Sequence, residues 1–222
     1  AQSEEFKVSG HTDYLDNEIE GKALMLMVSG NLRIGLLTDH IPVSKISESI
    51  TKEVVENKIN TIHKTLVEDF KISKPKIAIL GINPHSGDGG LIGVEEKTVL
   101  FPVFEKMREN NLLVFGPYSA DSFFGSRQHE SFDAVVATYH DQGLIPFKTL
   151  SFGQGVNFTA GLKKIRTSPD HGTAYSIAGK GIADETSFKE AVFLAIATYR
   201  NRKEHQELTK GAIKEENPTK TK

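Results

Sequence analysis

The chain has 222 residues, a formal net charge of −2 at pH 7 and no cysteine. This length is sufficient for one large domain, or for one domain and part of another. The near balance of charge gives no indication of a nucleic-acid or anionic-membrane partner. Without cysteine there is no disulfide and no thiolate ligand, so any metal ion must be held by His, Asp or Glu.

Targeting segments are not apparent. No apolar run reaches the roughly 20 residues that span a bilayer, and no basic flank precedes an apolar stretch of the kind found in secretory signals. We therefore expect a cytoplasmic enzyme. The residues from about Lys203 onward are rich in Lys, Glu and Thr, which predicts a helix end followed by a frayed tail.

Short apolar or β-branched runs bounded by Gly, Asn, Asp or Pro predict strands. They lie at 22–28, 32–37, 76–82, 112–115, 134–139 and 156–159. Apolar residues at helical spacing predict a helix over 54–70 and another after Gly93, where Glu95 and Glu96 would suit the positive end of the helix dipole. Strands alternating with helices favour a layered α/β fold.

A last helix is predicted near the C-terminus, where Ser187 and Glu190 have the spacing of a capping box. Its expected buried residues are Phe188, Val192, Ala195 and Tyr199.

Three of the eight histidines, His40, His85 and His140, stand just after predicted strands. In open α/β sheets ligands bind at the carboxyl ends of the strands. Three neutral imidazoles from such loops can hold one divalent ion and leave coordination positions open for a substrate. The alternative interpretation is three loop histidines that hydrogen-bond to the backbone, and the spacing alone does not decide between the two.

Two stretches are rich in small residues. The glycines of 87–93 do not match the G-x-G-x-x-G dinucleotide fingerprint. They indicate either a loop that needs positive φ values or a backbone cradle near a metal ion or phosphate. The second stretch, 170–184, would let a ligand approach the backbone closely, although its composition alone is that of an ordinary loop before a helix.

Lys148 and Arg166 flank the predicted strand that carries Asn157. Most Lys and Arg side chains are solvated surface groups, but here a phosphate could be bound by both cations together with the His11-Thr12 pair.

Asp141 stands beside His140. It could orient that imidazole or serve only in local turn hydrogen bonds.

Taken in order, the motifs of the chain resemble those of the 4-hydroxythreonine-4-phosphate dehydrogenase family of vitamin B6 biosynthesis. The matching segments cover nearly the whole chain except its tail. They are Gly-His-Thr at 10–12, Thr-Asp-His-Ile-Pro at 38–42, Gly-Ile-Asn-Pro-His-Ser-Gly-Asp-Gly-Gly at 81–90, Gly-Pro-Tyr-Ser-Ala-Asp at 116–121, Tyr-His-Asp-Gln-Gly at 139–143, Gly-Val-Asn at 155–157, Ile-Arg-Thr-Ser at 165–168 and Asp-His-Gly-Thr-Ala at 170–174.

The resemblance implies a two-domain α/β fold like that of isopropylmalate dehydrogenase. Residues 1–178 would form the metal- and substrate-binding dimerisation domain. Residues 179–222 would be the return segment of a first domain whose N-terminal part has no counterpart here, followed by the tail. The chain is thus expected to be a fragment, and the activity of the fragment itself stays open.

The same resemblance implies an NAD-dependent oxidation and decarboxylation of 4-phosphonooxy-L-threonine to 3-amino-2-oxopropyl phosphate, with NADP as the other possible oxidant. It implies one divalent cation, either zinc, cobalt, magnesium, nickel or manganese, on His40, His85 and His140. It also implies homodimers in which His140 of one chain meets His40 and His85 of the other.

Further roles follow from the resemblance and from the chemistry of the side chains. Lys148 could assist proton transfer, and Asp141 could orient its neighbour. The expected substrate contacts are His11, Thr12, Lys148, Asn157 and Arg166. The expected cofactor contacts are His171, Gly172, Thr173, Ala174 and Asp184.

Two other functions remain open. A related dehydrogenase of four-carbon sugar-acid phosphates, such as threonate or erythronate phosphate, would keep the same metal and phosphate residues. Alternatively, the chain could be a metal-binding dimerisation module without catalysis.

Overall fold

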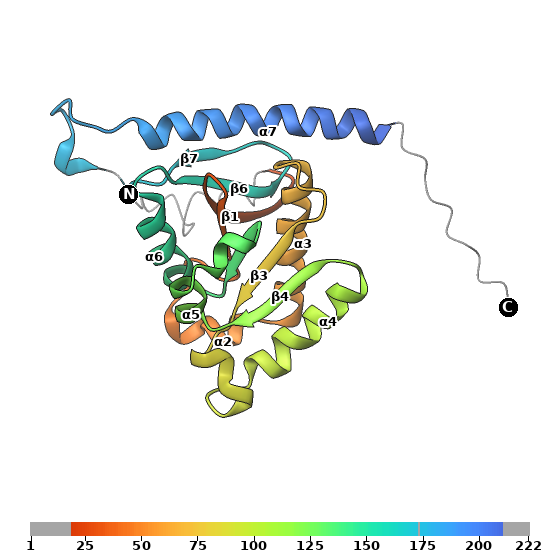
Figure 1. The fold of residues 1–222 in the computed structure, drawn as a ribbon. Helices are drawn as coiled ribbons and strands as arrows, with labels where there is room; N and C mark the ends of the chain where they lie inside the picture. Colours follow the sequence, from red (N-terminus) through yellow and green to blue (C-terminus); the bar gives the residue numbers. More distant parts are fainter. Residues whose placement is uncertain (1–18, 173, 211–222) are drawn as a thin grey trace.

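A mixed sheet of seven strands forms the centre of the molecule, as the computed structural model shows for residues 19–172 and 174–210 (Figure 1). The strand order across the sheet is β4-β3-β5-β2-β1-β6-β7. The strands are β1 (Gly21–Ser29), β2 (Leu32–Leu36), β3 (Lys76–Leu80), β4 (Leu113–Tyr118), β5 (Ala134–Ala137), β6 (Val156–Leu162) and β7 (Thr167–Pro169).

Four neighbouring strands, β4, β3, β5 and β2, run parallel. Their carboxyl ends therefore meet at one edge of the sheet, where ligands bind in α/β folds. The strands β1, β6 and β7 complete the sheet by antiparallel pairing. The fold is α/β, as the sequence predicted.

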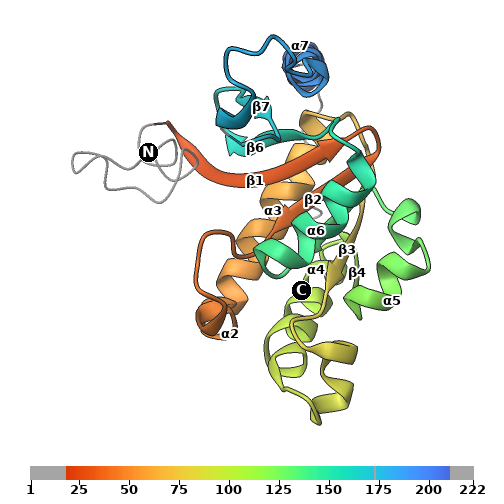
Figure 2. The ribbon, with the colours of Figure 1, turned by 90° about the vertical axis from the view of Figure 1, so that its left-hand side faces the viewer.

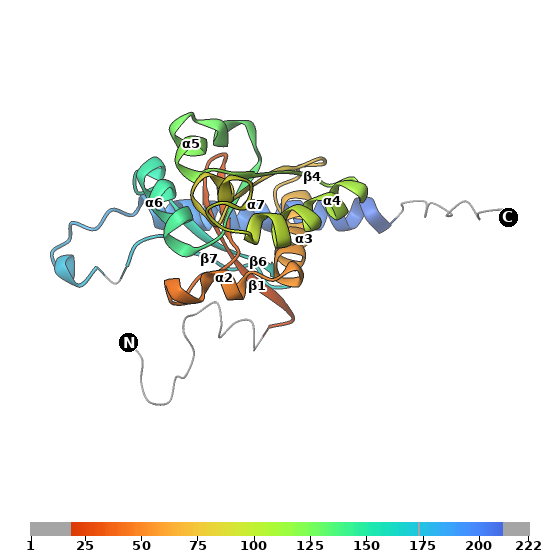
Figure 3. The same cartoon turned by 90° about the horizontal axis from the view of Figure 1, so that it is seen from below.

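Helices cover both faces of the sheet (Figures 2 and 3). On one face α3 (Lys52–Glu68) and α4 (Phe101–Glu109) enclose a core that includes Ile59, Phe104 and Phe158. On the other face lie α5 (Ala120–Gly125) and α6 (His140–Ser151), which pack Phe123, Leu144 and Phe147 against Ile34 and Leu36 of β2. The short α2 (Ile46–Ser49) precedes α3, and α7 (Thr186–Lys210) lies across β6 and β7.

The helix α3 shows why its segment folds as predicted. The hydroxyl of Thr51 accepts a hydrogen bond from the N–H of Val54 and caps the first turn. Val55, Ile59, Ile62 and Leu66 recur every three or four residues and are fully buried. Burial of one such side chain stabilises the fold by about 1.5–3 kcal/mol, so this stripe fixes the helix on the sheet.

All six predicted strands are present, each displaced at its ends by a few residues at most. No sequence pattern indicated β7, which is three residues long, ends at Pro169 and pairs with β6. The sequence also did not indicate α6, because Gly143 and Pro146 lie inside that helix and both residues disfavour helices locally.

The sequence predicted the wrong buried face for the C-terminal helix. In α7 the buried residues are Ser187, Ala191 and Thr198, whereas the expected Phe188 and Tyr199 are 60% and 63% exposed. The expected Val192 is also exposed and Ala195 is only half-buried. Small residues on the contacting side let the helix approach β7 closely, and the hydroxyl of Thr167 donates to the carbonyl of Ala191 at 2.8 Å.

The predicted capping box is also absent. The Ser187 hydroxyl donates to the Gly155 carbonyl at 2.6 Å and accepts from the N–H of Asp170 at 3.0 Å, so it joins α7 to the sheet. The first turn of α7 is instead capped by Asp184, whose carboxylate accepts from the N–H of Thr186. Among the helices of the described residues, none has the length and apolar character needed to cross a membrane.

Candidate active site

Two of the three predicted histidine ligands lie side by side at the carboxyl edge of the parallel strands. His40 follows β2, and His140 opens α6 directly after β5. Their ring centroids are 5.8 Å apart. A cavity of about 320 Å³ lies against both rings and is also lined by Asp39, Tyr139 and Asp141. The structure thus confirms that the strand ends bring these histidines together.

A hydrogen-bond network fixes three strand ends relative to one another. The Gln142 side chain accepts from the N–H and hydroxyl of Thr138 and donates to the Gly81 carbonyl at 2.7 Å. The Thr38 hydroxyl donates to the Thr138 carbonyl, also at 2.7 Å. Thr38, Gly81 and Thr138 follow β2, β3 and β5. The network therefore fixes the positions of these three strand ends, from which the loops of His40, His85 and His140 start.

Asp141 orients the imidazole of His140. Its Oδ1 lies 2.7 Å from Nδ1 of the ring. This contact favours the tautomer with the proton on Nδ1, which leaves the lone pair of Nε2 available to a ligand. Of the two roles considered for Asp141, the geometry therefore favours orientation of the imidazole.

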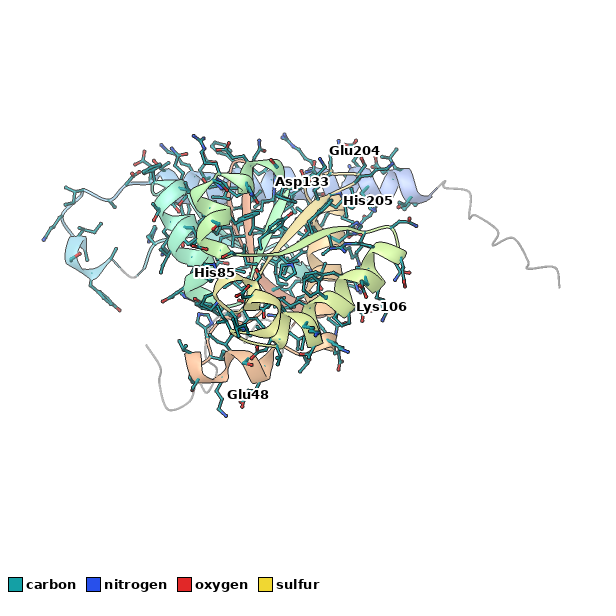
Figure 4. The ribbon with its side chains drawn as sticks, turned by 60° about the horizontal axis from the view of Figure 1, so that its bottom comes forward. Glu48, His85, Lys106, Asp133, Glu204 and His205 are labelled. Atoms are coloured by element: carbon teal, nitrogen blue, oxygen red, sulfur yellow. The ribbon has the colours of Figure 1, made fainter. Side chains whose placement is uncertain are left out.

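His85 lies in an unusual loop. Residues 85–89 all have positive φ values, between 43° and 78°, and three of these five residues are not glycine. The prediction that this glycine-rich stretch needs positive φ is confirmed. Figure 4 shows His85 on this loop, whereas Glu204 and His205 lie away from it on α7. The charge of His85 contributes to the lowered pKa of Asp121, after the hydrogen bond from Ser119, which is the main cause.

The part of one chain that the structure describes does not form a complete metal-ligand set. In the described ranges 19–172 and 174–210, no three His, Asp or Glu side chains are grouped so that they could hold an ion. His40 and His140 are neighbours, and His85 does not join them as a third ligand. The expectation that His140 meets His40 and His85 across a dimer interface stays a prediction.

Among the described residues of the predicted substrate site, Asn157 and Arg166 lie on the face of the sheet that α6 covers. Arg166 donates to the side-chain oxygens of Asn157 and Thr159, both at 3.3 Å. Burial lowers the pKa of Arg166, and none of the ion pairs among the described residues includes it. A half-buried guanidinium with neutral partners is well suited to bind an anion.

Lys148 lies beside Asp170. Its Nζ is 3.4 Å from both the carbonyl and the Oδ1 of Asp170. Burial raises the pKa of Asp170, and the ammonium of Lys148 opposes that shift. An anion that binds Lys148 would therefore have to share the cation with Asp170.

The expected cofactor contacts show local hydrogen bonds. His171 Nδ1 lies 3.0 Å from the Gly172 carbonyl, Ala174 has a positive φ of 52°, and Asp184 caps α7. The hydrogen bonds from Thr186 lower the pKa of Asp184. The predicted residues His11, Thr12 and Thr173 lie outside the described residues.

Sequence reasoning missed two residues that shape the site. Gln142 was visible inside the Tyr-His-Asp-Gln-Gly motif, but its partners on β3 and β5 are remote in sequence. Glu96 was expected only as an acid in the first turn of a helix, suited to the helix dipole. It is instead 2% exposed, and its carboxylate accepts hydrogen bonds from the backbone and side chain of Asn83.

Comparison with known proteins gives a consistent result. A family model described as the pyridoxal phosphate biosynthetic protein PdxA matches residues 1–195. A curated 4-hydroxythreonine-4-phosphate dehydrogenase of Bacteroides thetaiotaomicron is 49% identical over 203 residues, which are 90% of this chain and 56% of that protein.

Solved structures agree with these matches. A 4-hydroxythreonine-4-phosphate dehydrogenase from Burkholderia phymatum is 41% identical with a TM-score of 0.72, over 86% of this chain and 58% of that one. A terephthalate 1,2-cis-dihydrodiol dehydrogenase from Burkholderia xenovorans is 29% identical with a TM-score of 0.69, over 85% and 61%. The chain spans less than two thirds of the length of each of these proteins.

Proposed function

The chain belongs to the family of the pyridoxal phosphate biosynthetic protein PdxA, and on this premise we propose that its protein oxidises and decarboxylates 4-phosphonooxy-L-threonine with NAD. The products are 3-amino-2-oxopropyl phosphate, carbon dioxide and NADH. NADP is the alternative oxidant.

The observation that carries the proposal is the arrangement of donors around α6. This helix begins at His140, beside His40, and carries Lys148 two turns later. Arg166 and Asn157 lie on the same face of the sheet, where Asn157 donates to the sulfur of Met25 in the core beneath α6. Imidazoles at one end and cations at the other suit a substrate that carries a hydroxyl group to be oxidised and a phosphate.

The phosphate is assigned to the cations. Arg166 offers guanidinium donors in a partly desolvated position, and Lys148 adds a flexible point charge. His11 and Thr12 complete the proposed set. The phosphate lies away from the reacting carbon. The binding energy of the phosphate can therefore be used to position that carbon, which raises kcat.

The donor chemistry fits a divalent cation on His40, His85 and His140. The contact between Asp141 and Nδ1 of His140 leaves Nε2 free, as a ligating imidazole requires. Such an ion supplies Lewis acidity toward a substrate hydroxyl group. Zinc, cobalt, nickel, magnesium and manganese are the candidates, and elemental analysis of protein purified without chelator identifies the ion.

The reaction needs a proton acceptor. Oxidation of the C3 carbinol would release a hydride, which bound NAD would accept, and a proton, which a base must take up. Loss of carbon dioxide from the resulting β-keto acid would then require a proton at carbon. Lys148 is the proposed proton carrier, because it is the flexible group on α6, and Asp170 beside it can hold the proton in turn. Asp141 acts by keeping His140 oriented.

The cofactor is assigned to the loop before α7. His171, Gly172, Thr173 and Ala174 offer a small-residue surface that a ligand can approach closely, and Asp184 offers a carboxylate to the ribose hydroxyl groups. Asp184 is exposed and already caps α7, so its two roles compete for the same oxygens.

We further propose an isopropylmalate dehydrogenase-like arrangement of two domains and a homodimer with shared sites. Residues 1–178 form the metal- and substrate-binding domain, and residues 179–222 belong to the other domain. An exposed apolar stripe on α7, made of Phe188, Val192, Ile196 and Tyr199, supports this assignment, because such a surface is normally covered. A cytoplasmic location remains a prediction that cell fractionation can test.

The deciding experiment measures NADH formation at 340 nm by the complete product of the gene, supplied with 4-phosphonooxy-L-threonine and each metal ion. Turnover is expected with the parent protein and a loss of at least about 100-fold with His85→Ala, the size of effect that follows loss of an electrostatic catalyst. Unchanged turnover in His85→Ala would remove that histidine from the metal set.

A substrate panel separates the alternatives. Four-carbon sugar-acid phosphates test the related dehydrogenase, and a cis-dihydrodiol without phosphate tests the activity printed for the Burkholderia xenovorans neighbour. If the phosphate assignment holds, Arg166→Ala raises KM for phosphorylated substrates and leaves that for the dihydrodiol unchanged. Metal binding without NADH formation from any substrate would favour the non-catalytic module.

A further inference from the structure

Glu96 is a buried carboxylate beside the loop of His85. It begins the helical segment Glu96–Leu100 that leads into α4, and only 2% of it is exposed. None of the ion pairs among the described residues includes it. Burial of a charged group without a counter-ion is costly and persists only when hydrogen bonds or a functional need compensate.

Its hydrogen bonds are made to the residue at which the loop starts. Oε1 accepts from the N–H of Asn83 at 2.7 Å, and Oε2 accepts from the Asn83 side-chain amide at 2.9 Å. Both carboxylate oxygens are thereby used on one residue, two positions before His85.

The carboxylate also fills the inside of the loop. A Cβ atom added at Gly87 would lie 2.7 Å from Glu96 Oε2, and one added at Gly81 would lie 3.2 Å from Oε1. Glycine is therefore needed at 87 for space as well as for its φ of +78°. The backbone before and after His85 is packed directly on this one side chain.

The loop needs such support. His85, Ser86 and Asp88 have left-handed backbone conformations, which are unfavourable for L-residues. Backbone of this kind persists only where its surroundings determine it. Other hydrogen bonds of the loop include one from the Ser86 hydroxyl to the Pro117 carbonyl at 3.2 Å and one from the N–H of Ile92 to the Gly87 carbonyl at 3.1 Å.

We propose that Glu96 is the positioning residue for His85, and that its buried carboxylate, bound to Asn83, holds residues 85–89 in the left-handed conformation that presents this imidazole at the sheet edge. The functional consequence rests on the proposed metal site. The structural consequence, an ordered loop, does not depend on it.

The neighbouring Glu95 provides a matched control. It also accepts from the Asn83 side chain, at 2.8 Å, and it accepts from the Ser47 hydroxyl at 2.5 Å, but it is only half-buried and does not contact the loop backbone. Glu95→Gln and Glu96→Gln therefore make the same change in charge and shape at adjacent positions, and only the second faces the glycines.

The first measurement is amide hydrogen exchange of the full chain, read by mass spectrometry. In Glu96→Gln, exchange over residues 83–93 should accelerate about 10-fold or more, since about 1.4 kcal/mol of local opening energy corresponds to a factor of ten, while β3 and α3 keep their protection. Glu95→Gln should change the loop less than about threefold by the same conversion. Equal acceleration throughout the chain, or none in the loop, would overturn the proposal.

The second measurement is the affinity for Co²⁺, titrated by calorimetry on the complete gene product. Glu96→Gln should weaken binding about 10–100-fold, the range found when groups that support a metal ligand are lost, and Glu95→Gln should stay near the parent. If Glu96→Gln does not fold, Asn83→Ala removes one of the two contacts and should give a smaller change in the same direction.

His85→Ala separates the two proposals. If this variant binds Co²⁺ as tightly as the parent, the proposed metal set fails, and loop exchange alone then decides the role of Glu96. If His85→Ala loses affinity while Glu96→Gln keeps both affinity and loop protection, the metal set stands and the role of Glu96 is overturned.

Discussion

The imidazoles of His40 and His140 lie 5.8 Å apart between ring centroids, on loops that follow two neighbouring parallel strands. The register pairs Leu36 of β2 with Ala137 of β5. His40 comes four residues after Leu36, and His140 comes three residues after Ala137. The register between the two strands therefore brings both rings to the same edge of the sheet. This relationship defines the centre of the proposed site, and several consequences can be measured.

Loss of the carboxylate beside His140 should weaken metal binding. In Asp141→Asn the side chain no longer favours the Nδ1–H tautomer, so fewer molecules offer the Nε2 lone pair. We expect a 10–100-fold loss of Co²⁺ affinity at neutral pH, measured by titration of the complete protein. The control is Glu130→Gln, which alters only an exposed pair with Arg127. Equal affinities in both variants would contradict an orienting role for Asp141.

Replacement of Gln142 should destabilise the fold. Gln142→Leu leaves the N–H of Thr138 and the carbonyl of Gly81 without their partner, and each unsatisfied buried group costs about 1–3 kcal/mol. Urea unfolding should show a total loss of about 2–6 kcal/mol by the same rule. The exposed Gln128→Leu should change stability by at most about 0.5 kcal/mol. A loss no larger than that of the control would mean that the network does not hold the strand ends.

The attachment of α7 should depend on one ion pair. Arg202 donates to both carboxylate oxygens of Asp69, at 2.5 and 2.9 Å, and the Asp69 side chain is only 3% exposed. Asp69→Asn should cost about 3 kcal/mol, because it leaves the arginine charge without its partner.

The comparison for this ion pair is Glu204→Gln, which breaks the exposed pair with Lys71 and should cost less than about 1 kcal/mol. Amide exchange should rise within α7 of the Asp69→Asn variant before it rises in the sheet. If α7 and the sheet lost protection at the same time, the ion pair between Asp69 and Arg202 would not be a specific attachment of α7.

Stability should fall on mild acidification. Burial lowers the pKa of His63 and of His129 below the ordinary value of 6.5. Between the ordinary and the lowered pKa, each histidine is more protonated in the unfolded chain than in the folded chain. Stability therefore falls as the pH drops from about 7 toward the lowered pKa values of the folded state. Well above pH 6.5 both histidines are neutral in either state, and their contribution to stability is independent of pH.

The test compares thermal unfolding of the parent with that of His63→Gln/His129→Gln between pH 7.5 and 5. The double variant should show a shallower decline in stability over this interval, because two of the groups that take up protons on unfolding are gone. An identical slope would show that other groups cause the acid sensitivity.

Local sequence determined much of this protein. Apolar runs bounded by turn residues located six strands, and the helical spacing of apolar residues over 54–70 located α3, because such patterns reflect which face of an element is buried. The positions of His40, His85 and His140 just after strands predicted the edge at which ligands would bind. The family motifs added the expected chemistry.

The tertiary structure alone decided which remote groups meet. Strand order places Thr38, Gly81 and Thr138 around Gln142, and it pairs His40 with His140 within one chain. It turned the small residues of α7 toward the sheet and left the large ones exposed, and it buried Glu96 under the loop of His85. No local period encodes these contacts, because each depends on the register between segments that are far apart in the sequence.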